Sequence, residues 1–409
     1  MSRVSLGFAF VHATSEILTA LADELVAVRR DLHAHPELAW TETRTTDLLA
    51  TRLAAAGVRV RRLPRTGLLA EVGTEGEGPV VALRGDIDAL PLDDRSGLPW
   101  TSTTAGVAHA CGHDVHASAL LGAALTLQQL HERGALAGRV RFVFQPAEEV
   151  MPGGALDVIA AGGLTDVTSI FALHCDPSLD VGEVGLLEGP ITGAADHLVV
   201  HLSGRGGHTS RPHLTEDLTF ALGKLLTELP AVLSRRIDPR SGVSVVWGQV
   251  EAGVAPNVIP AEGRMSGTVR MLDAEAWAVA EEVVRRAVQL LAEPYGVEAV
   301  VHYTRGVPPV VNAPGATAAL RRAALTVLGP TGPASTRQSL GGEDFGWYLQ
   351  QVPGALARLG TRTPGGRTYD LHQGDLVVDE RAVTIGAALL AETALEALVA
   401  VSDEKVTLR

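Results

Sequence analysis

Residues 109–116 combine side chains that could bind a metal: His109, Cys111, His113, Asp114 and His116. Imidazole, thiolate and carboxylate are the usual protein ligands of zinc and related divalent ions. Cys111 and His113 share a side only where the backbone is extended, and an apolar run typical of a helix follows them. We expect two ligands in an extended segment entering a helix. The alternative is a helix N-terminus capped by Asp114, with histidines that bind nothing.

Further polar motifs follow apolar runs that predict buried strands at 79–86, 139–145 and 169–174. These motifs are Arg84–Pro91, Gln145–Glu149 and Leu173–His174, and Leu371–His372 lies in the C-terminal part. In open parallel α/β sheets, binding sites form beyond the carboxyl ends of the strands. We therefore expect these motifs to meet in space.

The adjacent carboxylates Glu148 and Glu149 suit two different roles. One can ligate a metal, which lowers the pKa of bound water to about 7, while the other takes the proton of that water and passes it to a leaving amine. The alternative is an exposed acidic pair at a helix start, where negative charge is favourable.

The candidate ligands number five: Cys111, His113, Glu149, His174 and His372. A single catalytic zinc takes about three protein ligands. Five suit two divalent ions about 3.5–4 Å apart that share a ligand or a water, and the Cys111 thiolate is a candidate bridge. Sulfur and imidazole favour zinc, cobalt or nickel, and the glutamate also admits manganese.

Strands and helices alternate over the first 190 residues, with helices predicted at 16–34, 43–57, 113–133 and 154–162. This order predicts an α/β domain with a mainly parallel sheet and helices on both faces. Helices predicted at 315–328 and 380–400 are expected to belong to the same domain. We expect a discontinuous catalytic domain of residues 1–190 and 308–409.

The pattern changes over residues 191–307. Strands are predicted at 196–204, 242–251, 262–272 and 297–304, with helices at 215–234 and 273–295. This β-α-β-β-α-β order is ferredoxin-like, so we expect an inserted α+β domain. Domain closure about the junctions near 190 and 308 is a hypothesis that follows from the insertion.

Composition limits the kinds of binding partner and the cellular compartment that we expect. A net charge of −13 argues against nucleic acid and anionic membranes as partners. Two cysteines, Cys111 and Cys175, exclude a disulfide scaffold and favour a reducing cytoplasm. The apolar run at 4–11 could be a weak signal peptide, but we favour an irregular cytoplasmic N-terminus. We expect no apolar stretch of the ~20 residues that a membrane span needs.

The chain resembles the metal-dependent aminoacylase and amidohydrolase family, which includes hippurate hydrolases, N-acetyl-diaminopimelate deacetylases and plant auxin-conjugate hydrolases. The resemblance runs from RDLHAHPEL at 30–38 to Leu371–His372. Its motifs occur in one order: CGHDVH at 111–116, QPAEE at 145–149, GGHTSRPH at 206–213 and GGEDF at 341–345. The combination is specific, whereas each motif alone is weak.

The resemblance implies that the five candidate ligands bind two metals and that Glu148 is the general base and acid. It implies that the inserted domain forms a homodimer, or a higher homo-oligomer, and places His208 in the partner's site as an oxyanion donor, an interaction worth ~3–4 kcal/mol. Without the resemblance, His208 would be a loop histidine between turn glycines.

The resemblance also implies substrate-binding residues. Asn257 and Arg270 would bind the substrate carboxylate or the polarised carbonyl, and a bidentate arginine suits a carboxylate. Glu343 is expected near the site. The alternative for Arg270 is a charge at a strand edge.

This sequence departs from the wider superfamily at two positions. Arg84 stands where a histidine often ligates metal, and arginine cannot ligate. Gly341 stands where the family often has serine. We expect Asp86 to orient a ligand and Asp88 to cap the following turn. The remaining histidines and the second cysteine are expected to pack or to orient ligands: His109, His116, His213 and Cys175.

The function that these residues favour is hydrolysis of the amide of an N-acyl amino acid, a small molecule, to a carboxylate and a free amino acid. One alternative is a metallo-dipeptidase or carboxypeptidase on the same site. Another is a non-catalytic metal- or ligand-binding protein, which the intact Glu148 argues against because a structural site needs no spare base.

Overall fold

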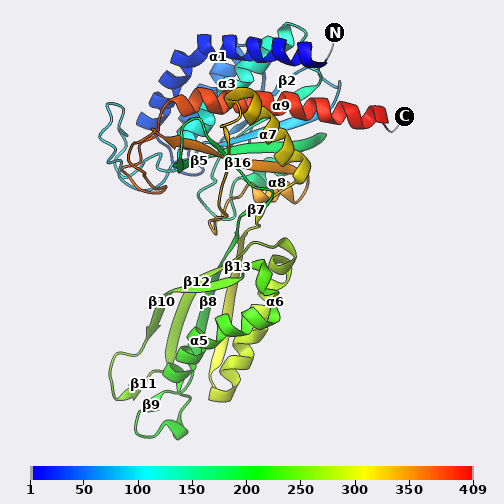
Figure 1. The fold of residues 1–409 in the computed structure, drawn as a ribbon. Helices are drawn as coiled ribbons and strands as arrows, with labels where there is room; N and C mark the ends of the chain where they lie inside the picture. Colours follow the sequence, from blue (N-terminus) through cyan, green and yellow to red (C-terminus); the bar gives the residue numbers. More distant parts are fainter. Residues whose placement is uncertain (1–2, 408–409) are drawn as a thin grey trace. The chain divides into compact units, whose positions relative to one another are not determined.

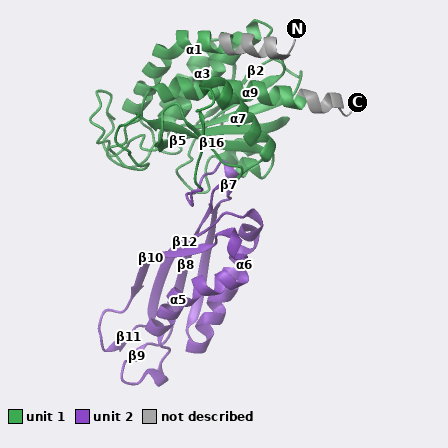
Figure 2. Ribbon diagram, in the orientation of Figure 1, with its two compact units in different colours: residues 1–189, 311–337, 347–409 green, residues 190–310, 338–346 purple. Residues whose placement is uncertain are grey.

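The computed structural model describes the backbone of residues 3–407 and the side chains of residues 13–401. The chain forms two compact units (Figure 2). Unit 1 contains the residues up to 189, residues 311–337 and the residues from 347 onward; unit 2 contains residues 190–310 and 338–346. The short strands β7 (Gly189–Thr192) and β14 (Val310–Asn312) lie where the chain passes from one unit to the other.

Unit 1 is built around an eight-stranded sheet in the order β1-β2-β4-β3-β5-β16-β6-β15. The strands are β1 (Arg59–Arg62), β2 (Leu68–Val72), β3 (Val80–Asp86), β4 (Arg139–Gln145), β5 (Val167–Asp180), β6 (Val184–Leu186), β15 (Pro333–Ser335) and β16 (Gly354–Arg362). The central strands β4, β3, β5 and β16 are mutually parallel, whereas β1, β2 and β6 add antiparallel pairs. The predicted α/β class is confirmed, and its mainly parallel part is the centre of the sheet.

The helices of unit 1 bury this sheet. They are α1 (Arg3–Ala34), α2 (Thr43–Ala55), α3 (His113–Glu132), α4 (Ala155–Ala160), α7 (Pro314–Leu328), α8 (Gly346–Leu349) and α9 (Arg381–Thr407). Helices α3 and α9 pack against β3 and β5, and α1 lies across both helices (Figure 1). Since all seven residues of β3 are buried and side chains alternate between the two faces of a strand, both faces of the sheet are covered at β3.

Helix α9 corrects one expectation. Among the described residues, its segment Arg381–Val401 is long and apolar enough to cross a membrane, so the expectation of no such stretch was wrong. However, 67% of its most apolar window is buried inside the structure. Its apolar composition is therefore that of a core helix.

Unit 2 has the predicted ferredoxin-like order. Its elements are β8 (Ala194–Ser203), α5 (Leu218–Arg236), β10 (Ser244–Ala252), β12 (Glu262–Met271), α6 (Ala274–Ala292) and β13 (Glu298–Val307). The strands form an antiparallel sheet in the order β10-β12-β8-β13, and α5 and α6 pack on it. The alternation in β8 is as predicted, because Leu198 and Val200 are buried while His197 and His201 are exposed.

A buried carboxylate organises the core of unit 2. Asp196 is fully buried and accepts hydrogen bonds from three groups. Trp277 Nε1 donates at 2.9 Å, the Tyr303 hydroxyl at 2.6 Å and the Gly306 amide at 2.9 Å. Asp196 thereby joins β8 to α6 and β13.

Candidate functional site

Unit 1 brings the five predicted metal ligands together from four separate parts of the chain. Cys111 lies in the loop before α3, and His113 is the first residue of that helix. Glu149 follows β4, His174 lies within β5, and His372 lies in the segment between β16 and α9. Because β3, β4 and β5 are parallel neighbours, the segments that follow their carboxyl ends meet at one edge of the sheet.

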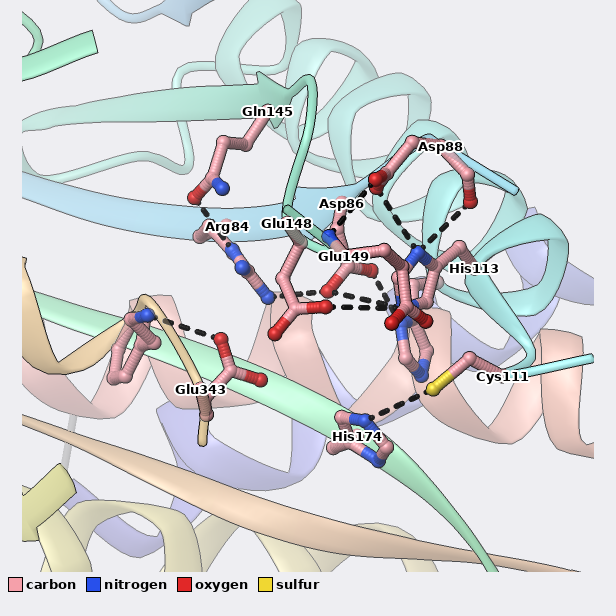
Figure 3. A network of polar contacts seen from close by, with 12 residues as sticks. Arg84, Asp86, Asp88, Cys111, His113, Gln145, Glu148, Glu149, His174 and Glu343 are labelled. Carbon is pink, nitrogen blue, oxygen red and sulfur yellow. Dashed lines mark hydrogen bonds and ion pairs between the residues drawn. The ribbon is translucent and has the colours of Figure 1, made fainter. Parts of the chain in front are cut away.

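The donor atoms form two groups of three that share one sulfur. Cys111, His113 and His174 form the first group, and Cys111, Glu149 and His372 form the second. The Cys111 Sγ lies 3.6 Å from His174 Nε2 (Figure 3). Glu149 Oε1 lies 3.4 Å from His372 Nε2 and 3.8 Å from His113 Nε2. Cys111 is the residue common to both groups.

Backbone carbonyls fix the tautomers of two of these histidines. The Nδ1 of His113 lies 2.9 Å from the carbonyl oxygen of Asp88, and the Nδ1 of His174 lies 2.8 Å from that of Cys175. A carbonyl can only accept, so Nδ1 carries the proton in both rings. Each Nε2, the nitrogen facing the cluster, is therefore the atom that can offer a lone pair to a metal.

Two buried polar atoms of the cluster lack hydrogen-bond partners among the described residues, and this bears on whether a cation fits there. They are His113 Nε2 and Glu149 Oε1. Ligands held at about 2.0–2.3 Å by a tetrahedral ion lie roughly 3.3–3.8 Å apart, and the separations of 3.4 Å (Glu149 to His372) and 3.6 Å (Cys111 to His174) within the two groups agree. The donor set fits a divalent ion.

Asp88 links two of the candidate ligands. Its Oδ1 lies 3.2 Å from Nδ1 of His113, and its Oδ2 accepts the backbone N–H of Glu149 at 3.0 Å. The expectation that Asp88 only caps a turn was wrong. The position of Asp88, two residues after the end of β3, could have indicated that it lies near the site. Its contact with Glu149 could not be foreseen, because Glu149 follows a different strand.

Asp86 and His116 hold the backbone beside His174. Asp86 accepts from Arg84 at 2.5 Å and lies 2.5 Å from His116 Nδ1. His116 Nε2 accepts the Cys175 amide at 2.8 Å. Because an amide only donates, Nε2 is unprotonated and the proton lies on Nδ1, toward Asp86. Both ring nitrogens of His116 are thus engaged, and Asp86 acts on this ring rather than on the Nδ1 of a candidate ligand.

The electrostatics of the cluster favour positive charge. Burial alone would lower the pKa of His113, but the carboxylates of Asp86, Asp88 and Glu149 raise it to about 10. Burial raises the pKa of the Cys111 thiol, and the charges of Glu149 and Glu148 raise it further. A nearby cation is what would favour the thiolate.

The pKa values of the two outer histidines shift in opposite directions. Burial lowers the pKa of His174, and the charge of Arg358 adds to this effect. The nearby carboxylate of Glu149 raises the pKa of His372, whose side chain is 55% exposed. The cluster is therefore closed at β5 and open toward solvent at His372.

Glu148 lies at the side of this cluster. Its Oε2 is 3.9 Å from His113 Nε2 (Figure 3), and its side chain is 9% exposed. Glu148 and Glu149 thus both approach His113, and neither is the exposed acidic side chain of the alternative interpretation.

The other predicted site residues lie in unit 2. His208 is in β9 (Gly207–His208), which pairs with β11 (Val258–Ile259). Asn257 is the residue immediately before β11. The Ser210 amide donates to His208 Nδ1 at 3.1 Å, so Nε2 carries the proton of the neutral ring and can act as a donor.

Arg270 and Glu343 both involve the segment 338–346. Arg270 donates to the carbonyl of Leu340, and Glu343 is buried and accepts the Phe345 amide at 2.9 Å. Strand β12, which carries Arg270, lies between β10 and β8. Arg270 is therefore on an inner strand of the sheet, one residue from the strand's end.

Comparisons with known proteins agree in the family they indicate. The model of peptidase family M20/M25/M40 matches residues 82–396. An N-acetylcysteine deacetylase of Bacillus subtilis is 37% identical over 92% of this chain and 97% of its own length. The crystal structure of a Bacillus subtilis dinuclear metal binding peptidase from the M20 family has a TM-score of 0.81 at 34% identity, covering 93% of this chain and 99% of the other.

A longer relative matches with higher identity. A Rhodococcus jostii protein named for glutamate–cysteine ligase is 49% identical over 91% of this chain, but the match covers only 47% of the relative. The chain spans about half of that protein. The name of the longer protein therefore assigns no activity to the matching half.

Proposed function

The chain belongs to peptidase family M20/M25/M40, and on this premise we propose that it is a metal-dependent hydrolase of N-acyl amino acids. It would cleave the amide bond to give a carboxylate and a free amino acid. The observation that carries the proposal is the pair of donor groups sharing Cys111, with Glu148 beside them. The relative named N-acetylcysteine deacetylase supports this substrate class.

The proposed cofactor is a pair of divalent ions, with zinc, manganese, cobalt and nickel as candidates. The residues that would hold them are the five donors Cys111, His113, Glu149, His174 and His372. When bound, the ions would polarise the amide carbonyl and make water a stronger acid.

Glu148 is the proposed general base and general acid. Its carboxylate takes a proton from the attacking water as the water oxygen bonds to the acyl carbon. When the C–N bond breaks, Glu148 returns this proton to the amine nitrogen. A peptidase on the same site would use the same proton transfer, so the two activities differ in the substrate that is bound.

Unit 2 is the proposed dimerisation and lid domain, inserted into a catalytic domain formed by unit 1. Its outer strand β10 pairs only with β12 among the described residues and exposes Val246 and Val250. An unpaired apolar strand edge is suited to a second copy of the chain. His208 would stabilise the oxyanion in the partner's site, and Asn257, Arg270 and Glu343 would bind the substrate. A homodimer by light scattering, made monomeric by Val246→Lys, would support this assignment.

The cytoplasm is the proposed compartment. Cys111 and Cys175 are both free and buried. A reducing compartment keeps the Cys111 thiol available as a ligand. Labelling of the free thiols in unfolded protein taken directly from cells tests this assignment.

The decisive experiment measures amino acid release after the protein is stripped of metal and reloaded with zinc, manganese, cobalt or nickel. N-acetylcysteine comes first, followed by other N-acetyl, N-benzoyl and longer N-acyl amino acids. Metal-dependent release, lost in Glu148→Gln and kept in the exposed control Glu75→Gln, is the expected result. Cleavage of dipeptides alone would favour the peptidase, and metal binding without any turnover would favour the binding protein.

A further inference from the structure

The turn that carries Glu148 begins in an unusual backbone conformation. Ala147 has φ = 53°, in the left-handed region that residues with a Cβ seldom adopt. Ala147 is also fully buried. Such a conformation persists only where surrounding contacts hold it, and these contacts are often concentrated at functional sites.

A carboxylate from a distant part of the chain holds this residue. Glu42 is fully buried, and its Oε1 accepts the amide of Ala147 at 2.8 Å. Its Oε2 accepts the hydroxyl of Thr66 at 2.6 Å. Both oxygens are therefore engaged, and one of them is bound to the residue immediately before Glu148.

Glu42 is not needed as a cap for its own helix. It stands at the N-cap of α2, but its side chain makes no capping hydrogen bond. Glu37 does so instead, since its two oxygens accept the amides of Arg44 at 2.9 Å and Thr45 at 2.8 Å. The Glu42 side chain is thus directed to the Ala147 turn.

The two ends of the turn have separate anchors. Glu42 holds Ala147 at the start, and the Gly154 amide donates to the Ala147 carbonyl at 2.9 Å. Asp88 holds the amide of Glu149 at the other end, at 3.0 Å. Loss of the first anchor should disturb Glu148 more than Glu149.

We propose that Glu42 is a positioning residue, which fixes the backbone of Ala147 and thereby aims the carboxylate of Glu148. The proposal rests on the proposed function, in which Glu148 moves the proton. In this proposal Glu42 positions Glu148, the general base, and Asp88 positions Glu149, the metal ligand.

The first test compares Glu42→Ala with Glu42→Gln in metal-loaded protein. Alanine leaves the Ala147 amide without its acceptor, so we expect kcat to fall about 10- to 100-fold, with KM within about twofold and metal content unchanged. Glutamine keeps an acceptor oxygen at the same place and should restore most of kcat. Glu37→Ala is the matched control, because it removes a carboxylate that caps α2 without touching the turn.

A second variant tests the backbone conformation itself. Glycine adopts positive φ freely, so Ala147→Gly added to Glu42→Ala should recover part of kcat. If Glu42→Ala does not fold, Glu42→Asp keeps the carboxylate but shortens the side chain by one methylene, which withdraws the acceptor from the Ala147 amide. A fall in kcat is expected there too, and an unchanged kcat would overturn the proposal.

Hydrogen exchange provides a readout independent of turnover. The peptide containing Ala147 should exchange faster in Glu42→Ala and at the normal rate in Glu37→Ala. The proposal is overturned if Glu42→Ala keeps the wild-type kcat, if metal is lost in parallel with kcat, or if Glu37→Ala has the same effect. If the unaltered protein hydrolyses no amide with any metal, the proposed function fails, and exchange at this peptide still decides whether Glu42 holds the turn.

Discussion

The Sγ of Cys111 lies 3.6 Å from Nε2 of His174, and the same sulfur belongs to the group with Glu149 and His372. A donor common to both groups should affect both ions. We expect Cys111→Ala to bind less than one equivalent of metal per chain, measured by elemental analysis after gel filtration. Cys175→Ala, which removes the other buried thiol, should bind as much as the unaltered protein. Equal metal content in the two variants would contradict a bridging role for Cys111.

Asp88 should control metal affinity without being a ligand. It contacts His113 Nδ1 and the Glu149 amide, and loss of such supporting contacts typically weakens metal binding about 10- to 100-fold. We expect this loss in Asp88→Ala, measured by competition with a chelating dye. Asp157→Asn, at an exposed position of α4, should bind metal normally. Unchanged affinity in Asp88→Ala would show that His113 and Glu149 keep their positions without it.

Gly112 should tolerate no side chain. Its φ is +85°, and a Cβ there would lie 2.7 Å from Cys175 Sγ. We expect Gly112→Ala to destabilise unit 1 by about 1–3 kcal/mol and to reduce metal content, because Cys111 and His113 flank it. Removing the sulfur in Gly112→Ala/Cys175→Ala should recover part of the unfolding free energy, measured in urea. A double variant no more stable than Gly112→Ala would exclude the steric cause.

The core of unit 2 should depend on Asp196. Its removal leaves three buried donors without their acceptor, and breaking a buried charged network costs about 3–5 kcal/mol. We expect Asp196→Ala to lose about that much, whereas Tyr303→Phe, which removes one hydrogen bond, should lose about 1 kcal/mol. Calorimetry of the two variants checks which of them loses more unfolding free energy. Equal losses would mean that the hydroxyl of Tyr303 carries the network.

Stability should depend on pH through His33 and Asp94. The His33 Nε2 lies 3.2 Å from Asp94 Oδ2. Burial lowers the pKa of His33, but Asp114 and Asp94 outweigh it and the net pKa is raised. Burial raises the pKa of Asp94, but its hydrogen bonds with His33 and Ser102 hold it well below the usual range. The sign of each effect follows from linkage.

A raised histidine pKa stabilises the fold below its unfolded value of about 6.5 and loses this effect as pH rises through the folded pKa. A lowered aspartate pKa stabilises the fold above about 3.9 and loses this effect as pH falls through the folded pKa. The pair should contribute most between about pH 4 and 6.5. We expect the difference in melting temperature between metal-free wild type and His33→Gln to shrink from pH 6 to pH 8.5. A constant difference would show that folding does not raise the pKa of His33.

The predicted donor set was accessible from the sequence because most of its residues lie in or near a recognisable element. Cys111 lies just before an apolar helix and His113 begins it, Glu149 follows an apolar strand, and His174 lies within another, which continues to Asp180. For parallel strands, this placement alone implies proximity. His372 was named as a candidate from the Leu371–His372 motif, and no helix or strand end marks it because its segment has no regular structure.

The contacts that orient these residues were not predictable. Glu42 and Ala147 are joined across a sequence separation of 105, and nothing in the local sequence of α2 indicates that a glutamate at its start contacts a turn after β4. The hairpin of β1 and β2 was also missed, because the short strand Arg59–Arg62 is mostly exposed and rich in arginine. Such features depend on packing rather than on periodicity.

The insertion of unit 2 has a consequence for how such a chain could arise. Ala195 of β8 pairs with Val307 of β13, so the first and last strands of the ferredoxin-like fold are neighbours, about 4.8 Å apart. The chain therefore leaves unit 1 and returns to it at two neighbouring strands, although more than a hundred residues lie between them. A hairpin turn could join the same two points. A host gene could acquire or exchange residues 190–310 as a module at a single surface loop, whereas residues 338–346 of the same unit come from a separate part of the chain. Evolution could thus vary the module while retaining the host's cluster of donors.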